Sequence, residues 1–309
     1  MDGNGYETQY SQADSLDGLF RSWQNSLCGS LSSPETRYLP WRLNMCVNYI
    51  TVSRQISFDW FRTPIEVDDE WRDEIYKDRL APFIVHDDQG NRTGLVGSYG
   101  FVPQRHRPFK KLTPEEKAKF DTKVAKALAQ GKPTPEPPRI RMDTMNARAE
   151  EVGSKLNYKR FWLQQQLCIV PALRVFEPNW ETGLHERWAI ELAGAEPIGL
   201  PGMWRTWEER DGTITHSFTH FTLNADDHPL LKRFHRPGEE KRGVAILRPE
   251  YYDDWLSSTN PEFARVLIEL RTETELRAFA APKVALDDDV EDAEGPALTI
   301  QVAPQASLF

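Results

Sequence analysis

The residue of this sequence best suited to unusual chemistry is Cys46, which directly follows Met45. If translation starts at Met45 and the methionine is removed, Cys46 carries a thiol and a free α-amine on one residue. These groups titrate near pH 8, with the α-amine at about 7.7–8.0 and the thiol at about 8.5. Cys46 then offers two nucleophiles side by side. The alternative interpretation is an ordinary buried thiol in a strand, because free cysteine is among the most buried residue types.

Three further segments contain side chains suited to proton transfer or hydrogen bonding. Asn146 opens the run Asn-Ala-Arg-Ala-Glu, which also fits a helix N-terminus with Asn146 as its cap. Glu177 closes the apolar run Cys168–Phe176, where desolvation would raise the pKa of a carboxyl toward neutrality, unless it is a surface glutamate at a turn. His235 lies in a basic loop and either exchanges protons near neutral pH or is merely exposed.

The sequence contains no metal or cofactor motif. His216 and His220 lie in a strand-like alternation rather than at the spacing of paired helical ligands, so a metal site built with His228 and His235 is only weakly indicated. The run Gly94–Gly97 lacks the lysine and the spacing of a phosphate-binding loop. We therefore expect neither a metal nor another cofactor.

The net charge of -9 is unevenly distributed. Residues 1–45 carry five acids and three bases, and residues 287–309 carry six acids and no base, which leaves about -1 for residues 46–286. Such a body can hold basic clusters that are either solvated faces or, where they converge, a groove for nucleic-acid phosphates. The clusters are Arg105–Lys111, Arg139–Arg148, Lys155–Arg160 and Lys232–Arg242.

The number of cysteines and the hydropathy of the chain indicate in which cellular compartment the protein works. Three cysteines cannot make a disulfide framework, and no stretch approaches the roughly 18 apolar residues of a membrane span. No basic leader followed by an apolar run begins the chain. We expect a cytoplasmic protein without a membrane partner.

The chain is expected to form one catalytic domain, residues 45–280, with an appendage at each end. Residues 1–44 are rich in Ser, Gly, Asn, Asp and Gln and show no sustained periodicity, which predicts disorder or a loose extension. Residues 281–309 form an acidic tail that we also expect to be disordered.

The body between these appendages is predicted to be rich in strands. Its helices do not follow a regular βαβ alternation, so we expect an α+β fold with a mainly antiparallel, barrel-like β-sheet core and flanking helices. Short apolar or alternating runs bounded by Gly, Pro and Asp define the strands. The candidate strands are Cys46–Thr51, Phe83–His86, Thr93–Phe101, Cys168–Phe176, Trp188–Leu192, Met203–Trp207, His216–Leu223 and Val244–Leu247.

One predicted helix has a complete start signal, with Thr113 as N-cap, Pro114 at the first helical position and Glu116 at the third. It should run to about Ala129. Together with the proline-rich segment after it, this helix marks an insertion over residues 112–138. The other predicted helices are Asn157–Leu167, Pro249–Ser257 and Pro261–Ala278.

Several motifs occur in an order that points to one family. They are Met45-Cys46, Tyr99–Pro103, Asn146–Glu150, Cys168–Ala172 followed by Phe176-Glu177, Thr219–Thr222, His235–Pro237 and Pro249–Leu256. Taken together, they resemble the SRAP family, the SOS response-associated peptidases that process abasic sites in single-stranded DNA. The resemblance runs from Met45 to about Leu256.

The chain departs from the family pattern at four places. Val47-Asn48 follows Cys46 where the family commonly has Gly-Arg, which removes an arginine expected to contact phosphate. Tyr99 stands where a tryptophan is usual, and Pro178 replaces the tryptophan that often follows the catalytic glutamate. The insertion over residues 112–138 is longer than the compact form of the family needs. We expect a base-stacking surface of different shape.

The resemblance implies a covalent reaction with an abasic site. The ring-opened sugar presents an aldehyde, which the α-amine of Cys46 attacks to form an imine, and the thiolate then closes on the same carbon to give a thiazolidine. Asn146 would orient the α-amine, Glu177 would transfer protons, and His235 would assist sugar opening or hold the phosphate side. The family also removes the residues before its cysteine autocatalytically, which implies a peptidase that crosslinks DNA and has lyase-like activity.

The resemblance also implies a DNA-binding set and a partner. Arg148 would contact phosphate, Thr222 would line the pocket, and Arg236 would also bind DNA. By residue type, Tyr99, Phe101 and Trp204 could offer stacking faces for single-stranded bases, although the tryptophans of this chain are by default core residues. The implied partner is single-stranded DNA that contains abasic sites, bound by a monomer in the cytoplasm that associates with the nucleoid during DNA damage.

Two other functions use the same residues. A thiol hydrolase with Cys46 and His235 would need only the thiol, and a non-catalytic single-strand binder would use the basic clusters and aromatic side chains. Imine formation requires Cys46 to be N-terminal, because an amide nitrogen cannot form an imine. We therefore expect that translation starts at Met45, with a misassigned start upstream, or that the extension is a propeptide cut before Cys46.

Overall fold

Residues 48–283 of the chain are described by a computed structural model. The expected N-terminal extension and the nucleophile Cys46 lie outside the described residues, as do residues 284–309 of the expected tail. Among the residues described, no helix is long and apolar enough to cross a membrane.

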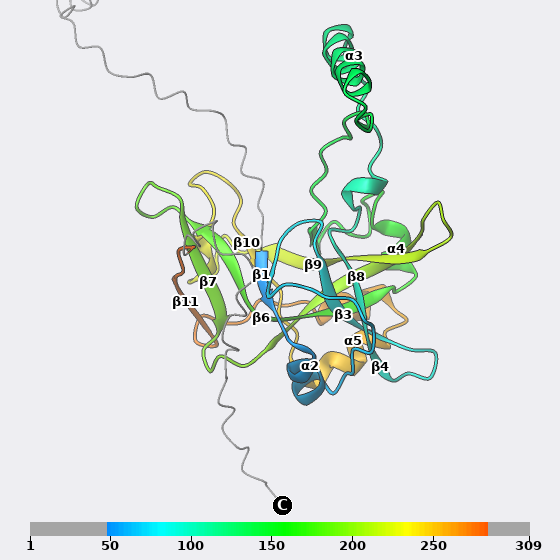
Figure 1. Cartoon of the computed structure of the whole chain (residues 1–309). Coiled ribbons are helices and arrows are strands. Elements are labelled where there is room, and N and C mark those ends of the chain that lie inside the picture. The colour runs from blue at the N-terminus through cyan, green and yellow to red at the C-terminus, as the bar shows by residue number, and fades with distance from the viewer. Residues whose placement is uncertain (1–47, 284–309) are drawn as a thin grey trace, which may run out of the picture. The chain divides into compact units, whose positions relative to one another are not determined.

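Five strands close into a barrel, which Figure 1 shows at the centre of the molecule. Around the ring, β6 pairs with β8, β8 with β9, β9 with β4 and β4 with β3. The ring closes because β3 pairs with β6. All of these pairs are antiparallel except β4 with β9. The predicted α+β fold with an antiparallel, barrel-like core is thereby confirmed. The barrel strands are β3 (Leu80–His86), β4 (Arg92–Tyr99), β6 (Leu167–Asn179), β8 (Ile198–Glu208) and β9 (Ile214–Asn224).

Strand β6 is long enough to belong to the barrel and to a second group of strands. It has 13 residues, and its first half, Leu167–Ala172, pairs with β8. Its second half pairs with β1 and β7 instead, and the register with β1 shifts where the change occurs. The additional strands are β1 (Asn48–Thr51), β2 (Glu74–Ile75), β5 (Asn146–Arg148), β7 (Glu186–Leu192), β10 (Arg242–Val244) and β11 (Leu276–Ala280).

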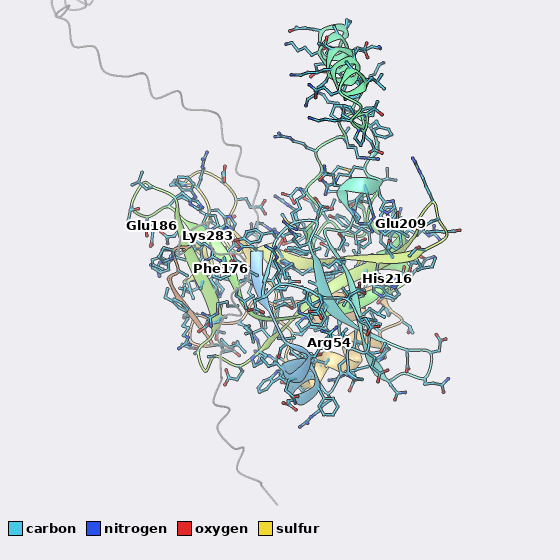
Figure 2. The ribbon with its side chains drawn as sticks, in the orientation of Figure 1. Arg54, Phe176, Glu186, Glu209, His216 and Lys283 are labelled. Carbon is cyan, nitrogen blue, oxygen red and sulfur yellow. The ribbon has the colours of Figure 1, made fainter. Side chains whose placement is uncertain are left out.

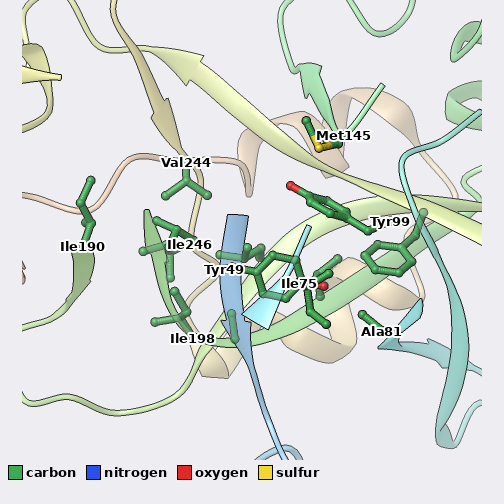
Figure 3. Packing of buried hydrophobic residues seen from close by; sticks show 14 of the residues in the cluster. Tyr49, Ile75, Ala81, Tyr99, Met145, Ile190, Ile198, Val244 and Ile246 are labelled. Atoms are coloured by element: carbon green, nitrogen blue, oxygen red, sulfur yellow. The ribbon is translucent and has the colours of Figure 1, made fainter. Parts of the chain in front are cut away.

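Alternation along the strands divides the buried residues into an inner and an outer cluster. On β6, Cys168 and Val170 belong to the inner cluster, while Leu167 and Ile169 belong to the outer one. Figure 3 shows Tyr49 and Tyr99 among the inner residues, all of which are buried. The outer cluster receives side chains from helices that cover the barrel. These helices are α2 (Arg54–Phe61), α4 (Lys159–Leu163), α5 (Tyr252–Leu256) and α6 (Pro261–Val266).

Helix α3 (Pro114–Ala129) confirms the helix predicted from its start signal. Thr113 accepts a hydrogen bond from the Glu116 amide while the Glu116 carboxylate accepts one from the Thr113 amide, so the capping box is complete. None of its residues is buried. The helix is therefore stabilised by its own cap and ion pairs rather than by packing.

Two predicted helices are shorter than the sequence suggested. The helix expected over Pro261–Ala278 ends at Val266, because the residues from Leu276 onward pair with the edge of β7 as strand β11. The helix expected over Asn157–Leu167 begins at Lys159 and ends at Leu163. Three short 3₁₀ turns complete the described chain, at Gln104–His106, Leu231–Arg233 and Pro249–Tyr251.

Replacing Trp255 by alanine should destabilise the barrel strongly. The indole of Trp255 is fully buried in the outer cluster and its Nε1 donates a 2.8 Å hydrogen bond to the Cys168 carbonyl on β6. Removing a buried aromatic ring of this kind costs about 3–5 kcal/mol. Urea unfolding measures this loss. The matched control is Leu128→Ala on α3, where the side chain is 63% exposed, and it should change stability by less than about 0.5 kcal/mol.

Candidate functional site

Glu177 is a carboxyl buried at the end of a strand. It is 4% exposed and lies in the second half of β6, opposite Trp188 of β7. Its Oε2 has no hydrogen-bond partner among the residues described. Burial raises the pKa of Glu177 to about 7, and the charge of His235 lowers it only in part. The interpretation of Glu177 as a surface residue at a turn is therefore wrong, because the strand continues through Pro178 to Asn179.

His235 is held against Glu177 by its backbone and by its ring. Its amide donates a 2.9 Å hydrogen bond to the Pro178 carbonyl, so the residue is tied to β6 next to Glu177. Its Nε2 lies 2.9 Å from the Arg242 carbonyl and 3.6 Å from Oε2 of Glu177. A carbonyl can only accept, so Nε2 carries the proton in this contact. The side chain is 3% exposed, which rules out the interpretation of an exposed loop histidine.

The backbone of His235 is strained. Its φ of 63° lies in the left-handed region, which costs a non-glycine residue roughly 1–3 kcal/mol. The Lys241 ammonium donates a 3.0 Å hydrogen bond to its carbonyl, and Phe234 forms a bridge with Asn179. These contacts fix the imidazole in one orientation toward the buried carboxyl.

Asn146 occupies a strand rather than a helix cap. It begins β5, which runs parallel to β9 and places Asn146 opposite His220. Its Oδ1 lies 3.4 Å from the Tyr99 hydroxyl, which is also 3.2 Å from Nδ1 of His220. Burial lowers the pKa of His220 to about 3, so this ring is neutral. The helix-cap interpretation of Asn146 is wrong because the Met145 carbonyl accepts from the His220 amide and ties the segment to the sheet.

Arg242 connects the two parts of the site, and its role was not predicted. Its carbonyl receives the His235 hydrogen bond, while its guanidinium donates to Glu150 at 2.9 Å and to the Thr222 carbonyl at 2.7 Å. Thr222 in turn lies opposite Arg148 of β5. In the sequence, Arg242 belongs to a basic cluster, and Glu150 ends the Asn146–Glu150 motif. These opposite charges were the sequence signal that could have suggested their ion pair.

Three residues of the expected DNA-binding set are buried. Tyr99 and Phe101 are 0% exposed and Thr222 is 3% exposed. Phe101 packs against Tyr158 and Phe161, so neither aromatic ring offers a face on which a base could stack. This corrects the stacking role expected for both rings. They belong to the core because barrel closure places the end of β4 beside β9.

Arg148 and Arg236 are accessible, unlike the buried members of that set. Arg148 has a side chain that is 41% exposed and is paired with Glu240 at 2.7 Å. Arg236 is exposed and lies over the ring of Trp180, 4.6 Å from its centroid. Trp180 follows the end of β6 and was not singled out from the sequence. It is a partly exposed aromatic ring three residues after Glu177.

A polar cluster lies where β1 begins. Asn48 is paired with Phe176, the residue before Glu177, and its amide donates to the Glu74 carboxylate. Arg187 also donates to Glu74, and its guanidinium lies 3.3 Å from the centroid of the Phe176 ring. Figure 2 shows Phe176 on one side of the body and His216 on the other. The described chain therefore begins beside the residue that precedes the buried carboxyl.

The histidines do not group into a metal centre. Across residues 48–283, no three His, Cys, Asp or Glu side chains are arranged to hold a metal ion. His228 is engaged with the Arg271 carbonyl at 2.7 Å, and His220 lies under Tyr99. The cysteine within this part of the chain, Cys168, is buried, and burial raises its pKa.

Comparison with known proteins identifies the family of this chain. A family described as SOS response associated peptidase (SRAP) matches residues 98–285 of the 309. The chain belongs to the SRAP family. The matched region includes the segments that carry Asn146, Glu177 and His235. No protein among the curated sequences matches it.

Solved structures of two bacterial proteins have the same fold. A protein from Bordetella bronchiseptica is 26% identical, with a TM-score of 0.61 over 77% of this chain and 100% of its own. A protein from Bacteroides thetaiotaomicron is 17% identical, with a TM-score of 0.54 over 76% of this chain and 91% of its own, and it supports the fold alone. Membership of the family makes this a protein associated with DNA damage, in a family associated with DNA binding.

Replacing Glu177 by glutamine should change how stability depends on pH. The carboxyl titrates at about 7 when folded and near the ordinary value of 4.5 when unfolded. Between these values the unfolded chain has released a proton that the folded protein keeps, so the wild type loses stability as pH rises. The loss approaches about 3 kcal/mol at about 1.36 kcal/mol per pH unit. The Glu177→Gln variant should not show this loss of stability with rising pH. Urea unfolding of both proteins at pH 5, 6, 7 and 8 measures the difference.

Glu181 supplies the matched control. Hydrogen bonds from Arg233 and Asn179 lower the pKa of Glu181 to about 2. Both its folded and unfolded pKa values lie below 5, so Glu181→Gln should shift stability by the same amount at every pH from 5 to 8. The difference in unfolding free energy between the wild type and Glu177→Gln could likewise be independent of pH. That result would show that the pKa of Glu177 is not raised in the folded protein.

Proposed function

We propose that this protein processes abasic sites in single-stranded DNA by forming a thiazolidine crosslink through Cys46, within a catalytic domain of residues 45–280. The observation that carries the proposal is the buried carboxyl of Glu177, with a pKa raised to about 7, beside His235. A group that is half protonated near neutral pH both gives and takes protons during imine formation. Membership of a family associated with DNA damage and DNA binding supports the choice of DNA as the substrate.

Chain connectivity brings Cys46 within reach of this carboxyl. Asn48 is paired with Phe176, the neighbour of Glu177. Two peptide units separate Asn48 from Cys46, which limits the distance between their Cα atoms to about 7 Å. An α-amine on Cys46 can therefore approach the end of β6 without any rearrangement of the barrel.

The reaction needs two bond-forming steps. The α-amine nitrogen attacks the aldehyde carbon of the ring-opened sugar, and the resulting carbinolamine loses water to leave an imine. The Glu177 carboxyl donates a proton to the departing hydroxyl, and its carboxylate accepts one from the amine. The Cys46 thiolate then adds to the imine carbon, and the nitrogen takes up a proton. One water is released for each crosslink formed.

Other residues of the site have supporting roles in this proposal. Asn146 orients the α-amine with its amide group, while His235 assists opening of the sugar ring. Arg148 and Arg236 are accessible guanidinium groups and would hold phosphates on either side of the sugar. Trp180, partly exposed beside Arg236, would replace the missing stacking faces of Tyr99 and Phe101. The same nucleophile would carry out the autocatalytic removal of residues before Cys46.

Protein with a confirmed Cys46 N-terminus should crosslink to a single-stranded oligonucleotide that contains one abasic site. The intact mass establishes the N-terminus, and denaturing electrophoresis after heating detects the adduct. A protein acetylated at Cys46 should form no adduct, because its nitrogen cannot become an imine. A thiol hydrolase would tolerate that acetylation, and a non-catalytic binder would never form an adduct. Absence of any adduct from the confirmed Cys46 protein would refute the proposal.

Glu177→Gln should slow crosslinking by about 10²-fold to 10⁴-fold, the usual contribution of a positioned proton-transfer group. The variant keeps the shape of the side chain but cannot donate or accept the proton. Its rate should also lose the inflection near pH 7 that the wild type shows, because the pKa of Glu177 is about 7. Rates from quenched time courses at pH 5.5–8.5 measure both effects. Equal pH profiles for the two proteins would contradict the assigned role.

A further inference from the structure

Residues 110–141 form a strongly basic segment, which we call the arm. The arm has nine lysines and arginines and four carboxylates, a net charge of +5. Each of its carboxylates is paired with a base of the arm itself. The pairs are Lys110–Glu116, Lys117–Asp121, Lys119–Glu115 and Arg139–Glu136, at 2.6–2.9 Å.

Five bases of the arm are left without a carboxylate within 4.0 Å among the described residues. Four are lysines on α3 or beside it, and the fifth is an arginine on the returning segment. Their charges are not balanced locally, so the arm presents an excess of positive charge to solvent. These bases are Lys111, Lys123, Lys126, Lys132 and Arg141.

An open hollow of about 950 Å³ lies between α3 and the returning segment. Two of the unpaired bases, Lys123 and Arg141, line it, together with Lys110 and Arg139. Phe120 and Ile140 contribute apolar side chains to its lining, and the carboxylates that also line it, Glu116 and Glu136, are paired with Lys110 and Arg139. Cations beside apolar side chains suit a ligand that has phosphates and flat bases.

The arm is joined to the body next to the candidate site. The Lys110 amide donates to the Pro138 carbonyl at 2.7 Å, and Phe109 forms an antiparallel bridge with Arg139. Beyond the arm, the Thr144 carbonyl accepts from the Phe101 amide, and the chain then enters β5 at Asn146. Five peptide units separate Arg141 from Asn146, which is at most about 17 Å of chain.

We propose that the arm binds the phosphate backbone of the DNA strand that flanks the abasic site. This inference rests on the proposed function for the choice of DNA. Because at most about 17 Å of chain separates Arg141 from Asn146, only a short stretch of strand would lie between the reacting sugar and the arm. Helix α3 has 16 residues and spans about 24 Å at 1.5 Å per residue, so it can follow several further nucleotides.

A nucleic acid fits this surface better than a protein partner. A helix that docks on a protein usually presents a broad apolar face, whereas half of the exposed residues of α3 are charged. Unpaired lysines spaced along one segment instead match the regular charges of a phosphate backbone. An acidic protein segment is the competing occupant, and the experiment below separates the two.

The test measures binding of two undamaged, fluorescein-labelled single strands, of 7 and 31 nucleotides, by fluorescence anisotropy in 50–200 mM salt. The arm variant is Lys123→Gln/Lys126→Gln/Lys132→Gln. Loss of three phosphate contacts should make the salt slope of binding shallower by about 2, since each contact contributes about 0.7 for single strands. The wild type should therefore lose about 20-fold more affinity than the variant over this range with the 31-mer. The undamaged 7-mer can occupy either the site or the arm, whereas the 31-mer can cover both, so the 31-mer carries the comparison.

The matched control removes three exposed bases outside the arm, as Arg62→Gln/Arg72→Gln/Arg210→Gln. All three side chains are exposed, and the control removes the same three positive charges as the arm variant. The inference is overturned if the control changes the 31-mer slope as much as the arm variant does, or if the arm variant changes nothing. If the arm variant changes nothing, the arm does not bind DNA, and an acidic protein segment becomes the favoured ligand.

Removing the arm provides a second readout. Residues 111–137 can be replaced by Asn-Gly, a turn that suits the antiparallel ends at Lys110 and Pro138. This variant should crosslink a 7-mer that contains an abasic site at the wild-type rate but bind the 31-mer with the shallower slope. If the proposed function is wrong, the wild type also forms no crosslink. If only the arm inference is wrong, the crosslink forms but removing the arm leaves the salt slope of 31-mer binding unchanged.

Discussion

The structure depends on a single strand that belongs to two sheets at once. Strand β6 closes the barrel with its first half through β8 and then continues, through a register shift of its partner β1, into pairing with β7. A strand of 13 residues can do this because its residues from Arg174 to Asn179 find new partners on β1 and β7. The consequence is that Glu177, which lies beyond the barrel opposite Trp188 of β7, is almost fully buried.

Burial of that carboxyl has a cost that the rest of the site accommodates. An ionised carboxylate without donors is unfavourable in an apolar setting, so the proton is retained up to about pH 7. Nε2 of His235 lies 3.6 Å from Oε2 of Glu177. At this distance it favours ionisation of the carboxyl but does not offset the effect of burial. Its strained backbone and its hydrogen bond to the Arg242 carbonyl hold it there. Arg242 also anchors Thr222 and Glu150, so one side chain joins β5, β9 and β10.

Much of the fold was predictable because its signals are local. The capping box at Thr113 predicted the start of α3 and Gly131 predicted its end near Ala129, since both signals lie in the local sequence. The main strands were found for the same reason, from alternation. By contrast, the first three residues of β11 were predicted to end a helix, because only pairing with the edge of β7 makes this segment a strand. Asn146 was ambiguous until β9 provided a parallel partner for β5.

The sequence by itself determined the chemistry of the side chains and the family order of the motifs that contain Asn146, Glu177 and His235. It also indicated that Glu177 ends an apolar run. Only the tertiary structure decided which groups are exposed, since closure of the barrel buried Tyr99 and Phe101 and left Trp180 and Arg236 accessible. The physical reason is that side-chain identity is local, whereas desolvation depends on which distant strands pack around a residue. Position along the chain cannot supply that information.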